Sequence, residues 1–256
     1  MTDARSTGAG LPHIHLLCLT TTVSDTFGEA AKKYFPDLNS HVEITVHHGR
    51  LNTLPESLRW DAIVSPANSY GRLDGAFDDA ISCALSPPND YDWTTRKAQK
   101  VLYEKWKGFA PPGTCTVVPL EDEEEMHSDE ALDVLRRSRP PRLLPWGVKY
   151  LLLCPTMRVP QEVTWDREVV YECIWSLLCA IEEHNKRARQ ESKITSILMT
   201  PLATGVGHVP YQRWAEQCVL AIRDWLASSR DPAKWSNLSW HQIYEDTRDV
   251  QETWQG

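Results

Sequence analysis

The sequence predicts an α/β protein, a three-layer α/β/α sandwich with a central mixed, mostly parallel sheet of about six strands. Two observations predict this fold class. Short continuous apolar runs alternate along the chain with segments whose apolar residues recur at helical spacing. Most of the apolar runs are close to continuous rather than strictly alternating with polar residues, which is typical of strands that helices bury on both faces. Hydrophobic residues make up 41% of the 256, which is ample for such a core.

Each predicted element has its own local signal. The strands are the apolar runs bounded by turn residues, at 13–19, 42–48, 60–65, 114–120, 148–154 and within 193–201. The helices are the segments whose apolar residues recur at helical spacing, and most end at a proline, a glycine or a run of charges. They are predicted at 24–36, 75–88, 94–108, 165–189 and 210–227. The fourth helix is the strongest, because acids stand at its start, bases at its end and an apolar stripe between them. Pro210 suits the first position of the last helix.

Three further segments lie outside this alternation. Residues 1–12 are expected to form a disordered N-terminus before a domain over 13–228. Residues 121–147 run from an acid block to a basic, proline-rich stretch and are expected to form a surface insertion. Residues 229–256 form an extension with three tryptophans in polar surroundings, which either pack onto the domain or mark a contact site. A protein partner at 121–147 or at this tail stays an open alternative.

Charge and cysteine usage narrow the function class. A formal net charge of -8 disfavours direct nucleic-acid binding, which relies on Lys and Arg, but not a small anion held by backbone N–H groups. The seven cysteines lack CxxC pairing, so free thiols are expected rather than a metal site or disulfides. Five lie in apolar runs and are expected to be buried: Cys18, Cys154, Cys173, Cys179 and Cys218. No targeting signal or membrane span is recognisable, so we expect a cytoplasmic or nuclear protein without cofactor or metal.

Two strand-to-helix turns carry the residues of most interest. "PANSYGRLDGAFDD" follows the strand at 60–65, and "PLATGVGHVP" follows the strand within 193–201. In open α/β sheets, ligands bind beyond the carboxyl ends of the strands. Small residues let a ligand approach the backbone, and helix N-terminal N–H groups favour anions. Two such turns facing one crevice would suit a diphosphate, although either turn alone is a common feature of α/β proteins.

Asn68 and Asp78 in the first turn each allow two interpretations. Asn68 follows a buried strand directly, where its amide can bind a ligand hydroxyl or cap its own turn. Asp78 lies near a helix start, where it can serve in catalysis or only interact favourably with the helix dipole. His208 and Arg72 are similarly open, as phosphate contacts or as ordinary exposed side chains.

These two turns resemble a known family. "VSPANSYGRLDGAFDDAI" and "TPLATGVGHVPYQRWAEQCVLAI" are similar to the two ligand loops of macrodomains, α/β modules that bind ADP-ribose. The separation of Asn68 and Asp78 matches the hydrolytic branch of that family. The resemblance covers roughly residues 13–228 and implies a macrodomain-like fold.

The resemblance also implies a site. Asn68 and Asp78 would be catalytic, with Asn68 on the distal ribose and Asp78 orienting or activating a water. The implied ligand contacts are Gly49, Arg50, Ala67, Asn68, Gly71, Arg72, Gly75, Ala76, Phe77, Thr204, Gly205, Val206, Gly207, His208 and Val209. The implied ligand is ADP-ribose or an ADP-ribosylated substrate.

The chain also departs from the family pattern. Where the family has Gly-Asp to accept the adenine amino group, "HHGRLN" has Gly49 and Arg50, and an Arg side chain has no acceptor. Asn52 or a backbone carbonyl is the remaining candidate for that contact. The first turn has fewer glycines than usual, and His208 and Val209 replace a Gly and an aromatic residue. The sequence therefore indicates a divergent member.

Three functions follow from these observations. The leading one is hydrolysis at the distal ribose of an ADP-ribose derivative, by removal of ADP-ribose from a protein carboxylate or of phosphate from ADP-ribose 1″-phosphate. The second is a reader module that binds ADP-ribose without turnover. The third, favoured by Arg50 and the tryptophan-rich tail, is an interaction domain with a degenerate pocket.

Overall fold

A computed structural model describes residues 10–120 and 144–255. Its centre is a six-stranded sheet in the order β2-β1-β6-β3-β5-β4. The strands are β1 (His13–Cys18), β2 (Ile44–His48), β3 (Ala62–Ser65), β4 (Thr116–Pro119), β5 (Tyr150–Leu153) and β6 (Ser196–Met199). β4 pairs antiparallel with β5, while β1–β2, β1–β6, β3–β6 and β3–β5 are parallel pairs. The predicted mixed, mostly parallel sheet is confirmed.

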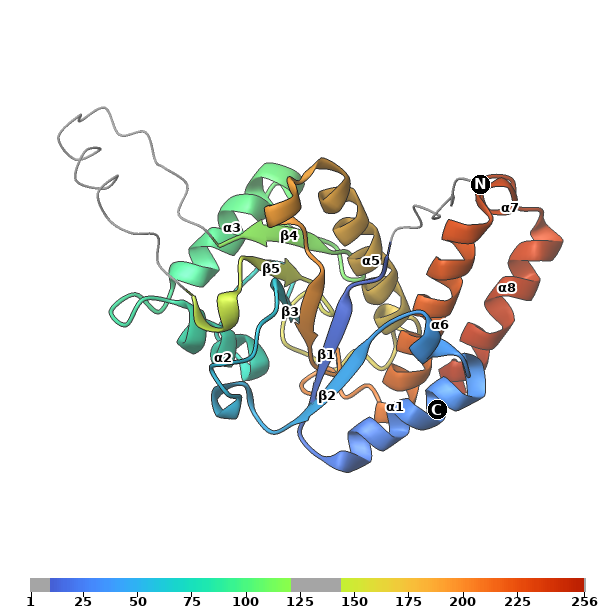
Figure 1. Ribbon diagram of the computed structural model, residues 1–256, viewed down its shortest axis with the longest axis horizontal. Coiled ribbons are helices and arrows are strands. Elements are labelled where there is room, and N and C mark those ends of the chain that lie inside the picture. The colour runs from blue at the N-terminus through green and yellow to red at the C-terminus, as the bar shows by residue number, and fades with distance from the viewer. Residues whose placement is uncertain (1–9, 121–143, 256) are drawn as a thin grey trace, which may run out of the picture.

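Helices cover both faces of this sheet (Figure 1). They are α1 (Thr21–Tyr34), α2 (Ala76–Leu85), α3 (Trp93–Trp106), α5 (Val169–Arg187), α6 (Tyr211–Arg230), α7 (Pro232–Trp235) and α8 (Trp240–Glu252). One buried cluster joins α1, α5 and α6 to the sheet, and a second joins α2 and α3 to its other face. The predicted three-layer sandwich is therefore confirmed. Within the described ranges, every helix is too short or too polar to cross a bilayer.

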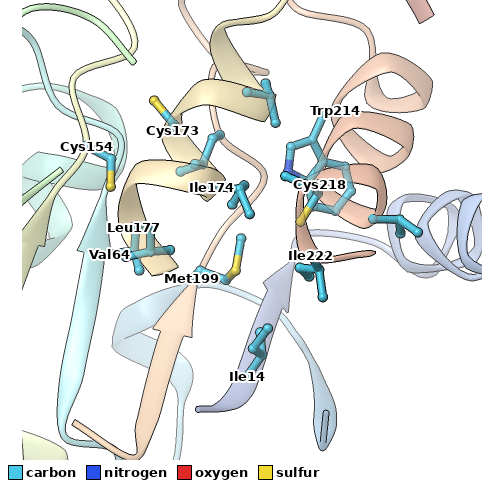
Figure 2. Packing of buried hydrophobic residues seen from close by; sticks show 14 of the residues in the cluster. Ile14, Val64, Cys154, Cys173, Ile174, Leu177, Met199, Trp214, Cys218 and Ile222 are labelled. Carbon is cyan, nitrogen blue, oxygen red and sulfur yellow. The ribbon is translucent and has the colours of Figure 1, made fainter. Parts of the chain in front are cut away.

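The core of the first layer shows why the apolar stripes form helices here (Figure 2). Ile174 and Leu177 of α5 point toward the strands, and Trp214, Cys218 and Ile222 of α6 pack in the same cluster. Side chains four residues apart lie on one helix face, so all the apolar side chains of a stripe are buried together when that face packs against the sheet. Full burial of one such aliphatic side chain contributes roughly 1.5–3 kcal/mol.

The segments predicted outside the alternation are described in part. Residues 1–9 and 121–143 lie outside the described residues. The last residues of the predicted insertion form a short 3-10 turn, Pro145–Gly147. Trp146 of this turn is buried, stacks on Trp60 with ring centroids 5.3 Å apart, and donates through Nε1 to the Pro55 carbonyl over 3.2 Å.

The tryptophans of the C-terminal extension differ in their environments. Trp235 packs on Trp175 of α5, with ring centroids 5.6 Å apart. Trp254 donates through Nε1 to Glu168 over 3.0 Å. Trp240 is 71% exposed and contacts Tyr244 on the same helix. Packing thus explains two of these side chains and leaves Trp240 at the surface.

The cysteine prediction needs one correction. Cys18, Cys154, Cys173 and Cys218 are buried free thiols, as expected. The prediction was wrong for Cys179, which is exposed. It directly follows Leu178 in α5, and one residue along a helix turns the side chain by about 100°. That rotation carries Cys179 off the apolar stripe.

Candidate functional site

Both ligand turns leave the sheet at the same edge. β3 and β6 are parallel neighbours, with Ala62 opposite Ile197 and Ile63 opposite Leu198. The first turn runs from β3 into α2, and the second runs from β6 into α6. Because the carboxyl ends of parallel strands meet at one edge, the two turns are brought together. They line a single cavity of about 700 Å³, a volume typical of small-molecule sites.

Most of the predicted site residues line this cavity. They are Gly49, Arg50, Asn68, Arg72, Gly75, Ala76, Phe77, Asp78, Thr204, Gly205, Val206 and Gly207. Asn52, the other candidate for a base contact, lines it too. Four predicted residues are absent from the lining: Ala67, Gly71, His208 and Val209. Ala67, Gly71 and Val209 are buried beneath their turns, and His208 is exposed outside the cavity. We expect these four to shape the turns rather than contact a ligand.

Sequence reasoning missed one wall of the cavity. Thr156, Met157 and Pro160 line it from the loop that follows β5. That loop is tied to the first turn, because Thr156 N–H donates to the Ala67 carbonyl over 2.9 Å and Ser69 N–H to the Met157 carbonyl over 2.9 Å. A signal was present, since "CPTMRVP" leaves a parallel strand that neighbours β3 at the same edge.

Asn68 caps its own turn. Its Nδ2 donates to the Arg72 carbonyl over 2.7 Å, and its Oδ1 accepts from the Tyr70 N–H over 3.0 Å. The Arg72 N–H approaches the same oxygen at 3.4 Å. The sequence allowed the Asn68 amide either to cap its own turn or to bind a ligand, and in the structure the amide caps the turn. The amide fixes the path of the first turn while still lining the cavity.

Asp78 is a buried carboxyl on the cavity wall. It is 7% exposed, and its Oδ1 accepts a hydrogen bond from the Ser65 hydroxyl over 2.6 Å. Burial raises the pKa of Asp78 from the usual 3.8 to about 7, and the charge of Asp74 adds to the rise, while the Ser65 bond opposes it. Oδ2 takes no hydrogen bond from residues 10–120 or 144–255. A carboxyl with one oxygen anchored, the other open and a pKa near neutrality is suited to exchanging a proton.

The other charged side chains at the first turn each have a polar partner. Arg72 contacts Asp74 at 2.6 Å and Asp92 at 3.6 Å. Asp79 accepts from the Tyr91 hydroxyl over 2.6 Å. Arg50 lines the cavity, and its guanidinium forms no ion pair within the described ranges. Arg50 is therefore the cation at this cavity that is left available for an anion or for an acceptor on a ligand.

The second turn is held tightly by its own backbone. The His208 N–H donates to the Gly205 carbonyl over 3.0 Å, and the Val209 N–H to the Ala203 carbonyl over 3.1 Å. A Cβ at Gly207 would lie 2.5 Å from the Ala203 carbonyl oxygen, so this position requires glycine for space. At Gly205 a Cβ would meet nothing within 4 Å.

Three residues with side chains adopt left-handed backbone conformations at these turns. They are Ala76 with φ of 51°, Ala203 with φ of 61° and His208 with φ of 56°. Such a conformation costs a non-glycine residue roughly 1–2 kcal/mol. Gly75, by contrast, has φ of -139° and serves as the N-cap of α2. Strain of this kind persists where surrounding contacts impose the shape of a turn, and it is enriched at functional sites.

Both turns leave backbone donors available at the cavity. The N–H groups of Ala76 and Phe77 open helix α2, and no hydrogen bond among the described residues uses them. The same holds for the N–H groups of Gly205 and Val206 in the second turn. Helix N-termini and glycine turns with unpaired N–H groups attract anions. Within the described ranges no cluster of three or more side chains is arranged to hold a metal ion.

Comparisons with known proteins return macrodomains. No protein-family profile matches the chain. An Oceanobacillus iheyensis macrodomain with ADP is 15% identical, with a TM-score of 0.44 over 77% of this chain and 83% of that chain. The same macrodomain with MES bound is also 15% identical, with a TM-score of 0.44 over 78% of this chain and 86% of that chain. A mutant of it with ADPR is 15% identical, with a TM-score of 0.45 over 67% and 73%. The chain is thus similar to these macrodomain structures at low sequence identity and at TM-scores below 0.5.

Proposed function

We propose that this protein binds ADP-ribose or a close derivative and hydrolyses a bond at the distal ribose. The substrate would be a protein carrying ADP-ribose on a carboxylate, or ADP-ribose 1″-phosphate. The observation that carries the proposal is the pair of turns. Unpaired N–H groups of Ala76 and Phe77 on one turn, and of Gly205 and Val206 on the other, belong to residues that line one cavity. This arrangement suits a diphosphate held between two helix-leading turns.

Asp78 supplies the chemistry in this proposal. A water beside Oδ2 transfers a proton to the carboxylate as its oxygen forms a bond to the anomeric carbon of the distal ribose, and the bond from that carbon to the substituent oxygen breaks. The carboxylate or phosphate substituent leaves with the bonding electrons, and solvent protonates it as required. Ser65 holds Oδ1 during this step, so the open oxygen keeps its direction. A base with a pKa near 7 is matched to work at neutral pH.

Asn68 has a supporting role in this proposal. Because its amide caps the turn, Asn68 fixes the chain that leads to Gly75 and Asp78. Its direct contact with the distal ribose stays a prediction from the sequence. Asn52 and Arg50 would meet the base end of the ligand, where Arg50 donates hydrogen bonds and the Asn52 amide both donates and accepts.

Two other functions are supported by particular observations. The unpaired N–H groups of the two turns would equally serve a reader that holds the diphosphate of ADP-ribose without turnover. Capping of Asn68 and the position of Arg50 favour an interaction domain whose pocket has lost its ligand. The hydrolase is preferred because neither alternative requires a buried carboxyl with an open oxygen.

Two measurements distinguish these functions. Calorimetric titration with ADP-ribose tests the pocket, and the proposal expects saturable binding. Release of ADP-ribose from a protein modified on carboxylates then tests turnover, comparing the wild type with Asp78→Asn and with Asp90→Asn. Asp90 is a matched control because it pairs with Arg96 and does not line the cavity. The proposal expects loss of release in Asp78→Asn alone. Equal release by all three proteins, or no binding at millimolar ligand, would contradict it.

A further inference from the structure

We infer that Thr253 and Trp254, which follow helix α8, are positioning residues for the second ligand turn, acting through the loop at 163–168. The inference rests on the proposed function, since that turn is one of the two proposed to hold the diphosphate. The cavity does not include either residue. Their effect is carried by a continuous series of contacts.

The first contacts join Trp254 to the 163–168 loop. Its indole Nε1 donates to Oε1 of Glu168 over 3.0 Å. The guanidinium of Arg167 lies over the same ring, with the carbon of the guanidinium 5.2 Å from the centroid. A hydrogen bond to a carboxylate and a cation–π contact are both stronger than a neutral contact of the same size. The ring therefore fixes two successive charged residues of the loop.

Two side chains of α6 bind the loop and the 253–254 segment together. Arg213 donates through Nη1 to the Thr164 carbonyl over 3.0 Å and through Nη2 to the Trp254 carbonyl over 3.2 Å. Gln217 donates through Nε2 to the Arg167 carbonyl over 2.5 Å and to the Thr253 hydroxyl over 2.9 Å. Both side chains are buried, so loss of one partner leaves a polar group without a replacement from solvent.

The loop in turn contacts the second turn. The Val163 N–H donates to the Gly207 carbonyl over 3.0 Å. The Val163 side chain also packs against Gly207, because a Cβ built there would lie 2.9 Å from Val163 Cγ2. Gly207 is pressed between Val163 and the Ala203 carbonyl. A shift of the loop therefore changes the space available to the turn.

The test replaces Trp254 and follows the second turn directly. In the Trp254→Ala protein, we expect faster hydrogen exchange at the Val163 and Val209 amides, and an ADP-ribose dissociation constant raised roughly 3- to 30-fold. Trp254→Phe keeps the ring over Arg167 and loses the donor to Glu168, so an intermediate effect is expected. Trp240→Ala is the matched control, since Trp240 lies at the surface of α8 and, among the described residues, its ring contact is with Tyr244 of the same helix.

The two readouts separate this inference from the proposed function. Exchange at Val163 and Val209 that is the same in Trp254→Ala, Trp240→Ala and the wild type would overturn the positioning role, whether or not ADP-ribose binds. Faster exchange in Trp254→Ala together with no ADP-ribose binding by any of the proteins would support the coupling and reject the proposed function. Faster exchange with unchanged affinity would show that the loop does not position the ligand turn, and would also overturn the inference.

Discussion

The Ser65 hydroxyl donates a hydrogen bond to Oδ1 of Asp78 over 2.6 Å, joining the last residue of strand β3 to the first turn of helix α2. Ser65 is completely buried, so this bond lies in a medium where electrostatic effects are strong. It partly offsets the cost of burying the carboxylate and keeps the pKa of Asp78 from rising further than about 7. The serine thus acts on the protonation state of the proposed base.

Removal of the Ser65 hydroxyl should move the pH profile of hydrolysis. Ser65→Ala deletes a hydrogen bond to the ionised form of Asp78, so the pKa of Asp78 rises above its present value near 7. The rising limb of the rate profile should shift upward by about one unit. Initial rates measured between pH 5 and 9 check this, with Ser176→Ala as the control because its hydroxyl bonds the distant Gly113 carbonyl. If the rising limb of the rate profile stays in place in Ser65→Ala, the protonation state of Asp78 does not control the rate.

Asp78 should also affect stability as a function of pH. Its pKa is about 7 in the folded protein and 3.8 ordinarily, so between these values the folded state binds the additional proton. The free energy of unfolding therefore falls as the pH rises from about 4 to about 7, by an amount of the order of 4 kcal/mol for this group. In Asp78→Asn that fall should be smaller. Urea unfolding at several pH values measures it, and parallel curves for the two proteins would contradict the burial of a titrating carboxyl.

A histidine pair on the neighbouring strands β1 and β2 should act in the opposite direction. His15 Nδ1 lies 2.9 Å from His47 Nε2, and the His13 ring is 4.1 Å away between centroids. Burial lowers the pKa of His15 to about 4, and the charges of His13 and His47 add to the decrease. Below pH 6.5 the unfolded state binds a proton at this histidine that the folded state does not bind until the pH reaches about 4. The contribution of His15 to the free energy of unfolding is therefore fully present above pH 6.5 and is lost as the pH falls through 4.

His15→Gln should accordingly make the free energy of unfolding less dependent on pH between 6.5 and 4. Urea unfolding curves recorded across that range check the change. The wild type, measured in parallel, provides the reference. An unchanged acid dependence in His15→Gln would mean that this ring is protonated in the folded protein.

Two glycines of the second turn should differ sharply in their tolerance of alanine. In Gly207→Ala the new methyl meets a backbone carbonyl oxygen at 2.5 Å, so the turn has to move. Overpacking of this kind costs roughly 1–3 kcal/mol, and ADP-ribose binding should weaken with it. In Gly205→Ala the methyl meets nothing within 4 Å, so the melting temperature should be unchanged. Equal melting temperatures for both variants would contradict the close approach at Gly207.

The layers of the fold could be predicted from the sequence because strands buried on both faces appear as apolar runs, and the helices that cover them have apolar residues at helical spacing. The stripe through Ile174, Leu177 and Ile181 identified a helix, and the run at 60–65 identified a buried strand. Parallel pairing of β3 and β6 then brought the two turns to one edge, as their strand-to-helix context predicted. Local periodicity was sufficient for these features.

Features that depend on contacts distant in the sequence were not predicted. Thr156 and Met157 reach the cavity only because their loop bonds the first turn. Within that turn, Gly71 and Ala76 have left-handed backbone conformations while Gly75 is extended, so residue type alone did not show which positions are left-handed. The sequence left the Asn68 amide open between capping and ligand binding, because both uses need the same side chain at the same position.

We propose that the N–H groups of both turns hold one diphosphate. Nuclear magnetic resonance of the amides, recorded during titration with ADP-ribose, tests it most directly. If both turns bind the diphosphate, we expect saturable shifts and slower hydrogen exchange at Ala76 and Phe77 on the first turn. The same changes should occur at Gly205 and Val206 on the second turn, at the same ligand concentration. Changes confined to one turn, or none at saturating ligand, would contradict it.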